Sequence, residues 1–158
     1  KSNNSDYLFV SAPENVAWLL NIRGYDNPNS PIPNARLIIN KNKKLFFIAK
    51  KNNSKKIIKE KKIDKDNVID IKDLPNLICK LKGKKFIIDN KSCSIFYENI
   101  IKSKFKILNK DDPIYKLKSI KNSFEIDVSI LGDGPERKNR GTLICSHYSE
   151  VYLDSARL

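Results

Sequence analysis

The stretch from Tyr7 to Gly24, YLFVSAPENVAWLLNIRG, decides the fold of this chain. Its first four residues are apolar and favour a β-strand. Pro13 then suits the first turn of a helix, and Glu14 is favourable beside the positive helix end. Gly24 is placed to end that helix. Apolar residues recur at helical spacing between these limits: Val16, Ala17, Leu19 and Leu20. The stretch therefore predicts a strand followed by a helix of about two turns.

Five further β-favouring runs and three further helical segments follow along the chain. The expected strands are Arg36–Ile39, Leu45–Ile48, Val68–Ile71, Phe86–Ile88 and Phe105–Leu108. The expected helices are Leu74–Lys82, Ser92–Ser103 and Ile114–Asn122. Asn40–Lys44 joins two strands as a hairpin, and Lys50–Lys62 is a solvated loop or a weak helix. Strands alternate with helices, so the fold class is α/β, a mixed sheet with flanking helices on both faces.

The same patterns predict burial and helix ends. Trp18 should be largely buried, and Cys79 and Cys93 should be small buried hydrophobes. Asp73 could cap the helix that follows it, and Gly83 should end that helix. Four residues of that helix should face the sheet: Leu74, Leu77, Ile78 and Leu81. In the next helix, one face carries Ile95, Phe96, Asn99 and Ile100.

The net charge is +13, from 31 Lys and Arg against 18 Asp and Glu. A basic chain can bind nucleic acid or a membrane surface, and phosphate-dominated binding weakens steeply with salt. Only five of the basic residues are Arg, the residue best suited to recognise phosphate and guanine. Lys, Asn and Ile dominate the rest, as in chains encoded by AT-rich DNA. Nucleic-acid binding is therefore disfavoured, and a lysine-rich binding module for nucleic acid or an acidic partner stays the alternative.

Residues that could carry chemistry are sparse. Cys79, Cys93 and Cys145 form no CxxC pair, so neither a zinc site nor a redox motif is expected, and the compartment should be reducing and cytoplasmic. His147 is the only histidine, and no metal-ligand pattern surrounds it. Cys145 and His147 could share a strand face as a thiol–imidazole pair, although chance spacing explains them better. We expect no catalytic residue and no metal ligand in this chain.

Length and composition suggest one domain and a tail. The chain has 158 residues, and no apolar run approaches the roughly 20 residues that a bilayer-spanning helix needs, so no membrane partner is expected. Residues 1–6 are polar, which gives no sign of a signal peptide, and Met is absent, so we expect a processed or excised piece of a longer protein. Arg and Gly become frequent near Val128. We therefore expect a domain over residues 1–127 and an unrecognised tail over 128–158, at most a poorly integrated hairpin.

The most informative segment runs from Asn15 to Asn34. Trp18 is the only Trp, and Arg23 is one of just two Arg in the first 136 residues. In a Lys-rich chain, an Arg suggests that the planar guanidinium fork is needed. Alternatively, Trp18 anchors a core helix and Arg23 pairs locally with Asp26. The residues alone leave both interpretations open.

This segment resembles the aminopeptidase P (Xaa-Pro aminopeptidase) pattern. That family shows a helix ending in a Trp-Leu-Leu-Asn-(Ile/Leu)-Arg-Gly block, here Trp18–Gly24, followed by a Pro-containing loop and a hairpin. Asp89–Ser94 resembles the turn that opens a later helix, and Asp112–Ile114 with Lys118–Asn122 resembles the exit segment into the catalytic domain. The resemblance covers about residues 7–126. It implies a creatinase/prolidase-type non-catalytic domain, N-terminal or middle in the parent enzyme, with a ribonuclease H-like motif.

The resemblance also implies a role. In that family the domain lies beside a pita-bread catalytic domain, narrows the entrance to the active site and supports a homodimer. The catalytic domain binds two divalent metals, usually manganese, acts on proline-containing peptides and is absent from this chain. By the same resemblance, the substrate-entrance or interface residues are Trp18, Asn21, Arg23, Gly24, Asp26 and Asn27.

Overall fold

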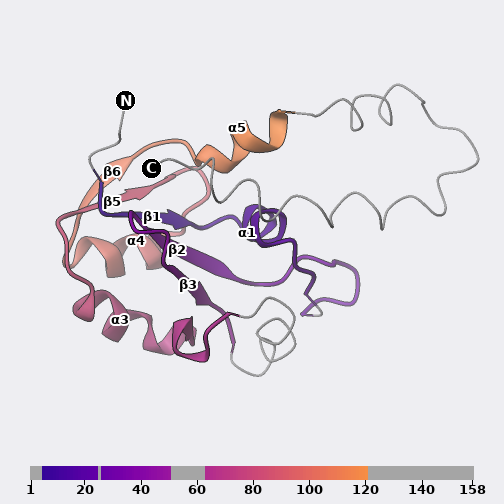
Figure 1. Ribbon diagram of the computed structural model, residues 1–158, viewed down its shortest axis with the longest axis horizontal. Helices are drawn as coiled ribbons and strands as arrows, with labels where there is room; N and C mark the ends of the chain where they lie inside the picture. Colours follow the sequence, from indigo (N-terminus) through magenta and orange to yellow (C-terminus); the bar gives the residue numbers. More distant parts are fainter. Residues whose placement is uncertain (1–4, 25, 51–62, 121–158) are drawn as a thin grey trace, which may run out of the picture.

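The computed structural model describes residues 5–24, 26–50 and 63–120 (Figure 1). Within these ranges, six strands form one sheet in the order β4-β3-β2-β1-β5-β6. The strands are β1 (Tyr7–Val10), β2 (Arg36–Asn40), β3 (Leu45–Ile48), β4 (Val68–Ile69), β5 (Lys85–Ile88) and β6 (Lys106–Asn109). β2 is antiparallel to both neighbours, and the other neighbouring strands are parallel. The expected mixed sheet and its β2–β3 hairpin are confirmed.

Helices cover both faces of this sheet. The α-helices of the described chain are α1 (Pro13–Leu20), α3 (Leu74–Lys80), α4 (Ile95–Lys102) and α5 (Pro113–Ser119), and the 3-10 turns are η1 (Lys65–Asn67) and η2 (Ile71–Asp73). Residues of α1 and α5 form one core cluster with the sheet. Residues of α3 and α4, which lie next to each other in Figure 1, form the second cluster on the other face. The three-layer α/β architecture follows from these two clusters.

The central strand β1 is buried on both faces. Leu8 and Val10 belong to the cluster with α1, whereas Tyr7 and Phe9 belong to the cluster with α3 and α4. The ring of Tyr7 stacks on Phe86 of β5 with centroids 5.0 Å apart. A strand buried on both faces reads as a continuous apolar run, which is why the sequence identified this strand clearly.

The expected apolar face of α4 is wrong. Ile95 and Phe96 are 74% and 54% exposed, and the buried residues are Tyr97 and Ile101. The helix begins at Ile95, after Ser94, and its rotation is set by Tyr97, whose ring lies 5.4 Å from that of Phe9. Tertiary packing of one aromatic ring therefore decides which of two plausible faces is buried.

The helix ends also differ from expectation. α1 ends at Leu20 with Asn21 as its C-cap, so Gly24 does not terminate it. α3 ends at Lys80 with Leu81 as its C-cap, ahead of Gly83. Asp73 stands at the N-cap of α3 without a capping bond from its side chain. Asp70 instead caps η2 by accepting from the amide of Lys72 at 3.1 Å, which also ends β4 at Ile69.

Burial predictions have mixed outcomes. In α3, Leu74 and Ile78, together with Leu81 beyond its end, are buried against the sheet, with Leu77 partly buried beside them, as expected. Trp18 is only partly buried. Cys79 is exposed and Cys93 is partly buried, so neither is a core residue. Burial still raises the pKa of the Cys93 thiol to about 11, which keeps it protonated and unreactive.

Several expectations fall on residues that the structure does not describe. These are most of the lysine-rich segment 50–62, the end of the last helix beyond Ile120, and the tail 128–158 with Cys145 and His147. Over the described residues, no helix is long and apolar enough to cross a membrane.

Candidate functional site

The C-terminal end of α1 is a sharply defined turn. Asn21 adopts a left-handed conformation (φ 47°, ψ 55°), which Asn tolerates better than most residues. The amide of Asn21 donates to the carbonyl of Trp18 at 3.2 Å, and the amide of Ile22 donates to the carbonyl of Ala17 at 3.0 Å. This Schellman-type ending returns Ile22 to the core. The exposed Arg23 therefore directly follows a residue, Ile22, that is anchored in the core.

Gly24 closes the base of the loop that follows. Its amide donates to the carbonyl of Pro31 at 2.8 Å. A Cβ at this position would lie 2.3 Å from the Cα of Pro33, so only glycine allows the two backbone segments to approach this closely. Gly24 is buried and acts through backbone packing, not as a contact surface.

Residues 26–34 form the projecting loop, which leaves the body of the domain between α1 and β2 in Figure 1. The carboxylate of Asp26 accepts from the amide of Asn34 at 2.9 Å, which ties one side of the loop to the other. At the tip, the carbonyl of Asn27 accepts from the amide of Ser30 at 3.2 Å, and its side chain accepts from the amide of Asn29 at 2.9 Å. The loop is therefore braced by its own hydrogen bonds although its side chains are mostly exposed.

The structure brings the six expected site residues to one end of α1. Arg23, Asp26 and Asn27 are exposed, and Asn21 is half-buried. Trp18 packs against the core cluster below them. Arg23, Asp26 and Asn27 therefore form an exposed surface, whereas Trp18 and Gly24 support it from below.

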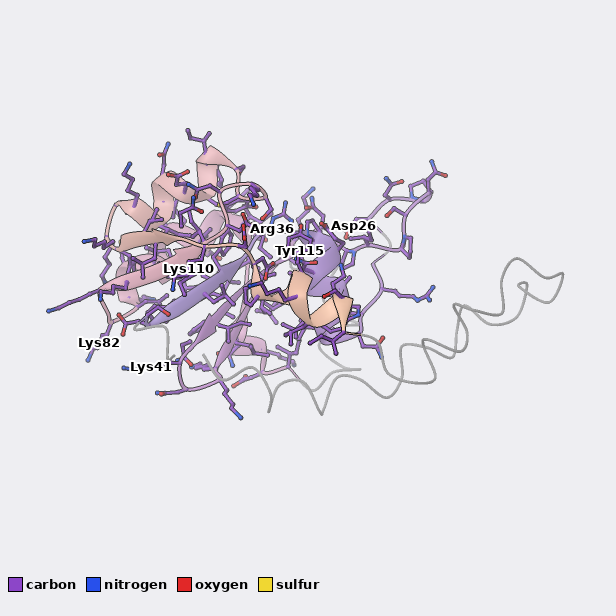
Figure 2. All side chains as sticks on the ribbon, turned by 90° about the horizontal axis from the view of Figure 1, so that it is seen from above. Asp26, Arg36, Lys41, Lys82, Lys110 and Tyr115 are labelled. Atoms are coloured by element: carbon purple, nitrogen blue, oxygen red, sulfur yellow. The ribbon has the colours of Figure 1, made fainter. Side chains whose placement is uncertain are left out.

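An open pocket lies at the carboxyl edge of the sheet, where the parallel strands β1, β5 and β6 end. Its volume is about 360 Å³, and it is lined by Asp89, Lys91, Ser92, Asp111, Asp112, Tyr115 and Lys116. In Figure 2, Tyr115, Arg36 and Asp26 all lie to the right of Lys41 and Lys82. The pocket and the projecting loop thus share the carboxyl edge of the parallel strands.

Two of the pocket residues, Asp89 and Asp112, belong to a buried hydrogen-bond network that includes Asn15 and Lys118. The amide nitrogen of Asn15 donates to a carboxylate oxygen of Asp112 at 2.7 Å, and Lys118 Nζ donates to the amide oxygen of Asn15 at 3.0 Å. The carboxylate of Asp89 accepts from the amide of Asp112 at 3.1 Å. Sequence reasoning missed this network. The sequence signal that could have revealed it is one Asp after each of two strands: Asp89 directly follows β5, and Asp112 follows β6 three residues after its end.

Two neighbouring Asp residues of the pocket, the buried Asp112 and the exposed Asp111, have pKa values shifted in opposite directions. Burial raises the pKa of Asp112, although hydrogen bonds from the amide of Ile114 and from Asn15 oppose the shift. At the exposed rim, the hydrogen bond from Lys91 at 2.8 Å lowers the pKa of Asp111. Among the residues that the structure describes, no group of three or more His, Cys, Asp or Glu side chains is placed to hold a metal ion.

Comparison with known proteins identifies the domain. Residues 1–125 match the family model for the creatinase/prolidase N-terminal domain. The chain is 27% identical over 155 residues to Xaa-Pro aminopeptidase ApepP of Drosophila melanogaster and 30% identical over 131 residues to Xaa-Pro aminopeptidase 1 of Dictyostelium discoideum. These alignments cover 94% and 80% of this chain but only 24% and 20% of the relatives, so the chain spans about a fifth to a quarter of their length.

Solved structures of similar fold lead to the same family. X-Pro aminopeptidase from Thermotoga maritima has a TM-score of 0.56 at 15% identity, over 78% of this chain and 35% of that one. Prolidase from Pyrococcus furiosus has a TM-score of 0.54 at 22% identity, over 80% of this chain and 35% of that one. At these identities the likeness shows the fold. Together with the family match, it establishes that this chain belongs to the creatinase/prolidase N-terminal domain family, whose relatives here include Xaa-Pro aminopeptidases.

Proposed function

We propose that this domain is the non-catalytic accessory domain of a metal-dependent Xaa-Pro aminopeptidase, and that it restricts access to the active site. The observation that carries the proposal is the braced projecting loop, with Arg23 exposed at its base. The two relatives at 27% and 30% identity are both named Xaa-Pro aminopeptidases. Family membership gives no support to the alternative of a lysine-rich binding module.

The loop suits a role in exclusion because it is exposed and internally tied. A wall at an active-site entrance discriminates by rejecting substrates that do not fit, and it adds no chemistry of its own. The guanidinium of Arg23 follows the C-terminal end of α1, where the helix dipole favours positive charge. From there its planar fork can donate to a peptide carboxylate or carbonyl.

The neighbouring surface supports a docked partner. Ile32, Ile95, Phe96 and Tyr115 are large apolar side chains that are 39% to 74% exposed. All four lie at the carboxyl edge, in the projecting loop or in the first turns of α4 and α5. Apolar surface of this kind favours burial against another domain.

In this proposal the partner is a pita-bread catalytic domain holding two divalent metals, manganese in the first instance, and the parent enzyme is a homodimer that cleaves proline-containing peptides. The free thiols of Cys79 and Cys93 fit a reducing, cytoplasmic location.

The purified 158-residue chain tests the non-catalytic role. With manganese added, we expect no release of the N-terminal residue from an Xaa-Pro tripeptide above the rate without protein. A chain that joins this domain to a peptidase domain should cleave the same peptide under the same conditions. Manganese-dependent cleavage by the 158-residue chain alone would disprove the accessory assignment.

A further inference from the structure

Two side chains, one in α5, the last described helix, and one at its N-cap, hold one side chain of α1 by hydrogen bonds. Asn15 lies in the first turn of α1, whereas Asp112 is the N-cap of α5 and Lys118 lies in its last turn. Asn15 donates to Asp112 at 2.7 Å and accepts from Lys118 at 3.0 Å, across 97 and 103 residues of sequence. We call Asn15, Asp112 and Lys118 the clasp.

Every hydrogen bond of the clasp pairs a donor atom with an acceptor atom. Asn15 is fully buried and Asp112 is 2% exposed, so each needs its hydrogen bonds supplied by the protein. The amide group of Asn15 offers a donor to a carboxylate and an acceptor to an ammonium group. The other oxygen of Asp112 accepts from the amide of Ile114 at 2.9 Å. No atom of this set can change its hydrogen-bonding role without leaving a buried group unpaired.

The clasp holds the end of α1 opposite to the projecting loop. α1 has 8 residues and therefore a length of about 12 Å. Its first turn carries Asn15, and Arg23 and the loop follow its last turn. A short helix moves as a rigid rod, so a tilt at the first turn displaces Arg23 and the loop at the other end.

We infer that the clasp is a positioning device that sets the orientation of α1, and with it Arg23 and the projecting loop, relative to α5. The sequence continues for a further 38 residues beyond Ile120, just after α5. Asn15, Asp112 and Lys118 are accordingly positioning residues for substrate discrimination. The kinetic part of this inference rests on the proposed accessory function, whereas the structural part stands on the geometry alone.

An exchange of two side chains tests the structural part in the 158-residue chain. Asn15→Asp places two carboxylates together. In Asp112→Asn the one remaining oxygen is needed by the amide of Ile114, so the new NH2 group faces the NH2 group of Asn15. The double variant restores the match, because the new carboxylate at position 15 accepts both from Lys118 and from the new amide at position 112. Lys118→Met is a milder break because it removes only one of the two hydrogen bonds of the Asn15 side chain, and Lys116→Met on the same helix is its matched control.

Trp18 reports the result because it is the only Trp and lies on α1. We expect each single variant to increase acrylamide quenching of Trp18 and to accelerate hydrogen exchange at the amides of Ile22 and Gly24 about tenfold or more. The double variant should return exchange to within about twofold of the original chain. Unchanged exchange in Lys118→Met, or a double variant no better than its single variants, would overturn the inference.

The kinetic part needs a chain that carries both this domain and a peptidase domain. There we expect Lys118→Met to raise KM for an Xaa-Pro peptide with little change in kcat, and the double exchange to restore KM. An unchanged KM, with faster exchange at Gly24, would refute the positioning role. Arg23→Ala separates two explanations of that result. If Arg23→Ala also leaves kcat/KM unchanged, the proposed accessory function is wrong. If Arg23→Ala lowers kcat/KM, the accessory function stands and only the positioning role of the clasp is wrong.

Discussion

Two backbone contacts that depend on single residues shape the domain. Gly24 lets the chain pass directly against Pro33 at the base of the projecting loop. Asp6, before β1, accepts from the amides of Lys84 and Lys85 at 2.7 and 3.0 Å and so joins the starts of β1 and β5. The sequence pattern indicated neither role, because each depends on a segment that lies elsewhere in the chain.

Gly24→Ala should reduce stability by about 2 kcal/mol, because the added methyl group overlaps the backbone of Pro33. Urea unfolding measures the loss. Asn29→Ala, at the exposed tip of the same loop, is the control and should cost less than about 0.5 kcal/mol. Equal stability of the two variants would mean that the base of the loop is not packed as described.

Asp6→Asn should lower the melting temperature by a few degrees at pH 7. The backbone amides of Lys84 and Lys85 hold the pKa of Asp6 below its ordinary value of 3.8, so its ionised form stabilises the fold. That contribution is fully present above the ordinary value and is lost as pH falls through the lowered pKa. The difference in melting temperature between the two proteins should therefore disappear in strong acid. A difference that persists there would assign the effect to altered packing.

At the level of elements, the strands were the most predictable part of the fold. β1, β2, β3 and β5 are short apolar runs buried by helices on both sides, and such runs stand out in any sequence. Helix ends were less predictable, because Asn21 ends α1 ahead of Gly24, and the side chain that makes a capping bond is Asp70 at η2 and not Asp73 at α3. The rotation of α4 could not be predicted, since Phe96 and Tyr97 are adjacent aromatic residues and only contact with Phe9 selects between them.

Truncation of these two neighbours tests the rotation of α4. Tyr97→Ala should cost about 3 kcal/mol, since it removes a buried ring that packs on Phe9 and lies beneath the guanidinium of Arg36. Phe96→Ala should cost less than about 1 kcal/mol because its ring is 54% exposed. Thermal unfolding of both variants gives the comparison. A larger loss for Phe96→Ala would restore the face that the sequence alone suggested.

At the scale of the whole molecule, the carboxyl edge gathers the projecting loop, the apolar residues Ile95 and Phe96, and the clasp. The loop could be predicted, because it directly follows the Trp18–Gly24 block in one continuous stretch of sequence. The clasp could not, because its members lie about a hundred residues apart and only the packing of α5 on α1 brings them together. Local sequence therefore marks the projecting loop, and only the fold reveals the hydrogen bonds of the clasp.

The most direct test of the proposed role replaces Arg23 in a chain that joins this domain to a peptidase domain. Arg23→Ala should lower kcat/KM for an Xaa-Pro peptide about tenfold or more, by loss of a charge-assisted hydrogen bond, with little change in melting temperature. Lys82→Ala removes one charge at the opposite edge, away from Asp26 in Figure 2, and should leave both quantities unchanged. If Arg23→Ala leaves kcat/KM unchanged, Arg23 is only a residue at a helix end, and this surface does not form the entrance to an active site.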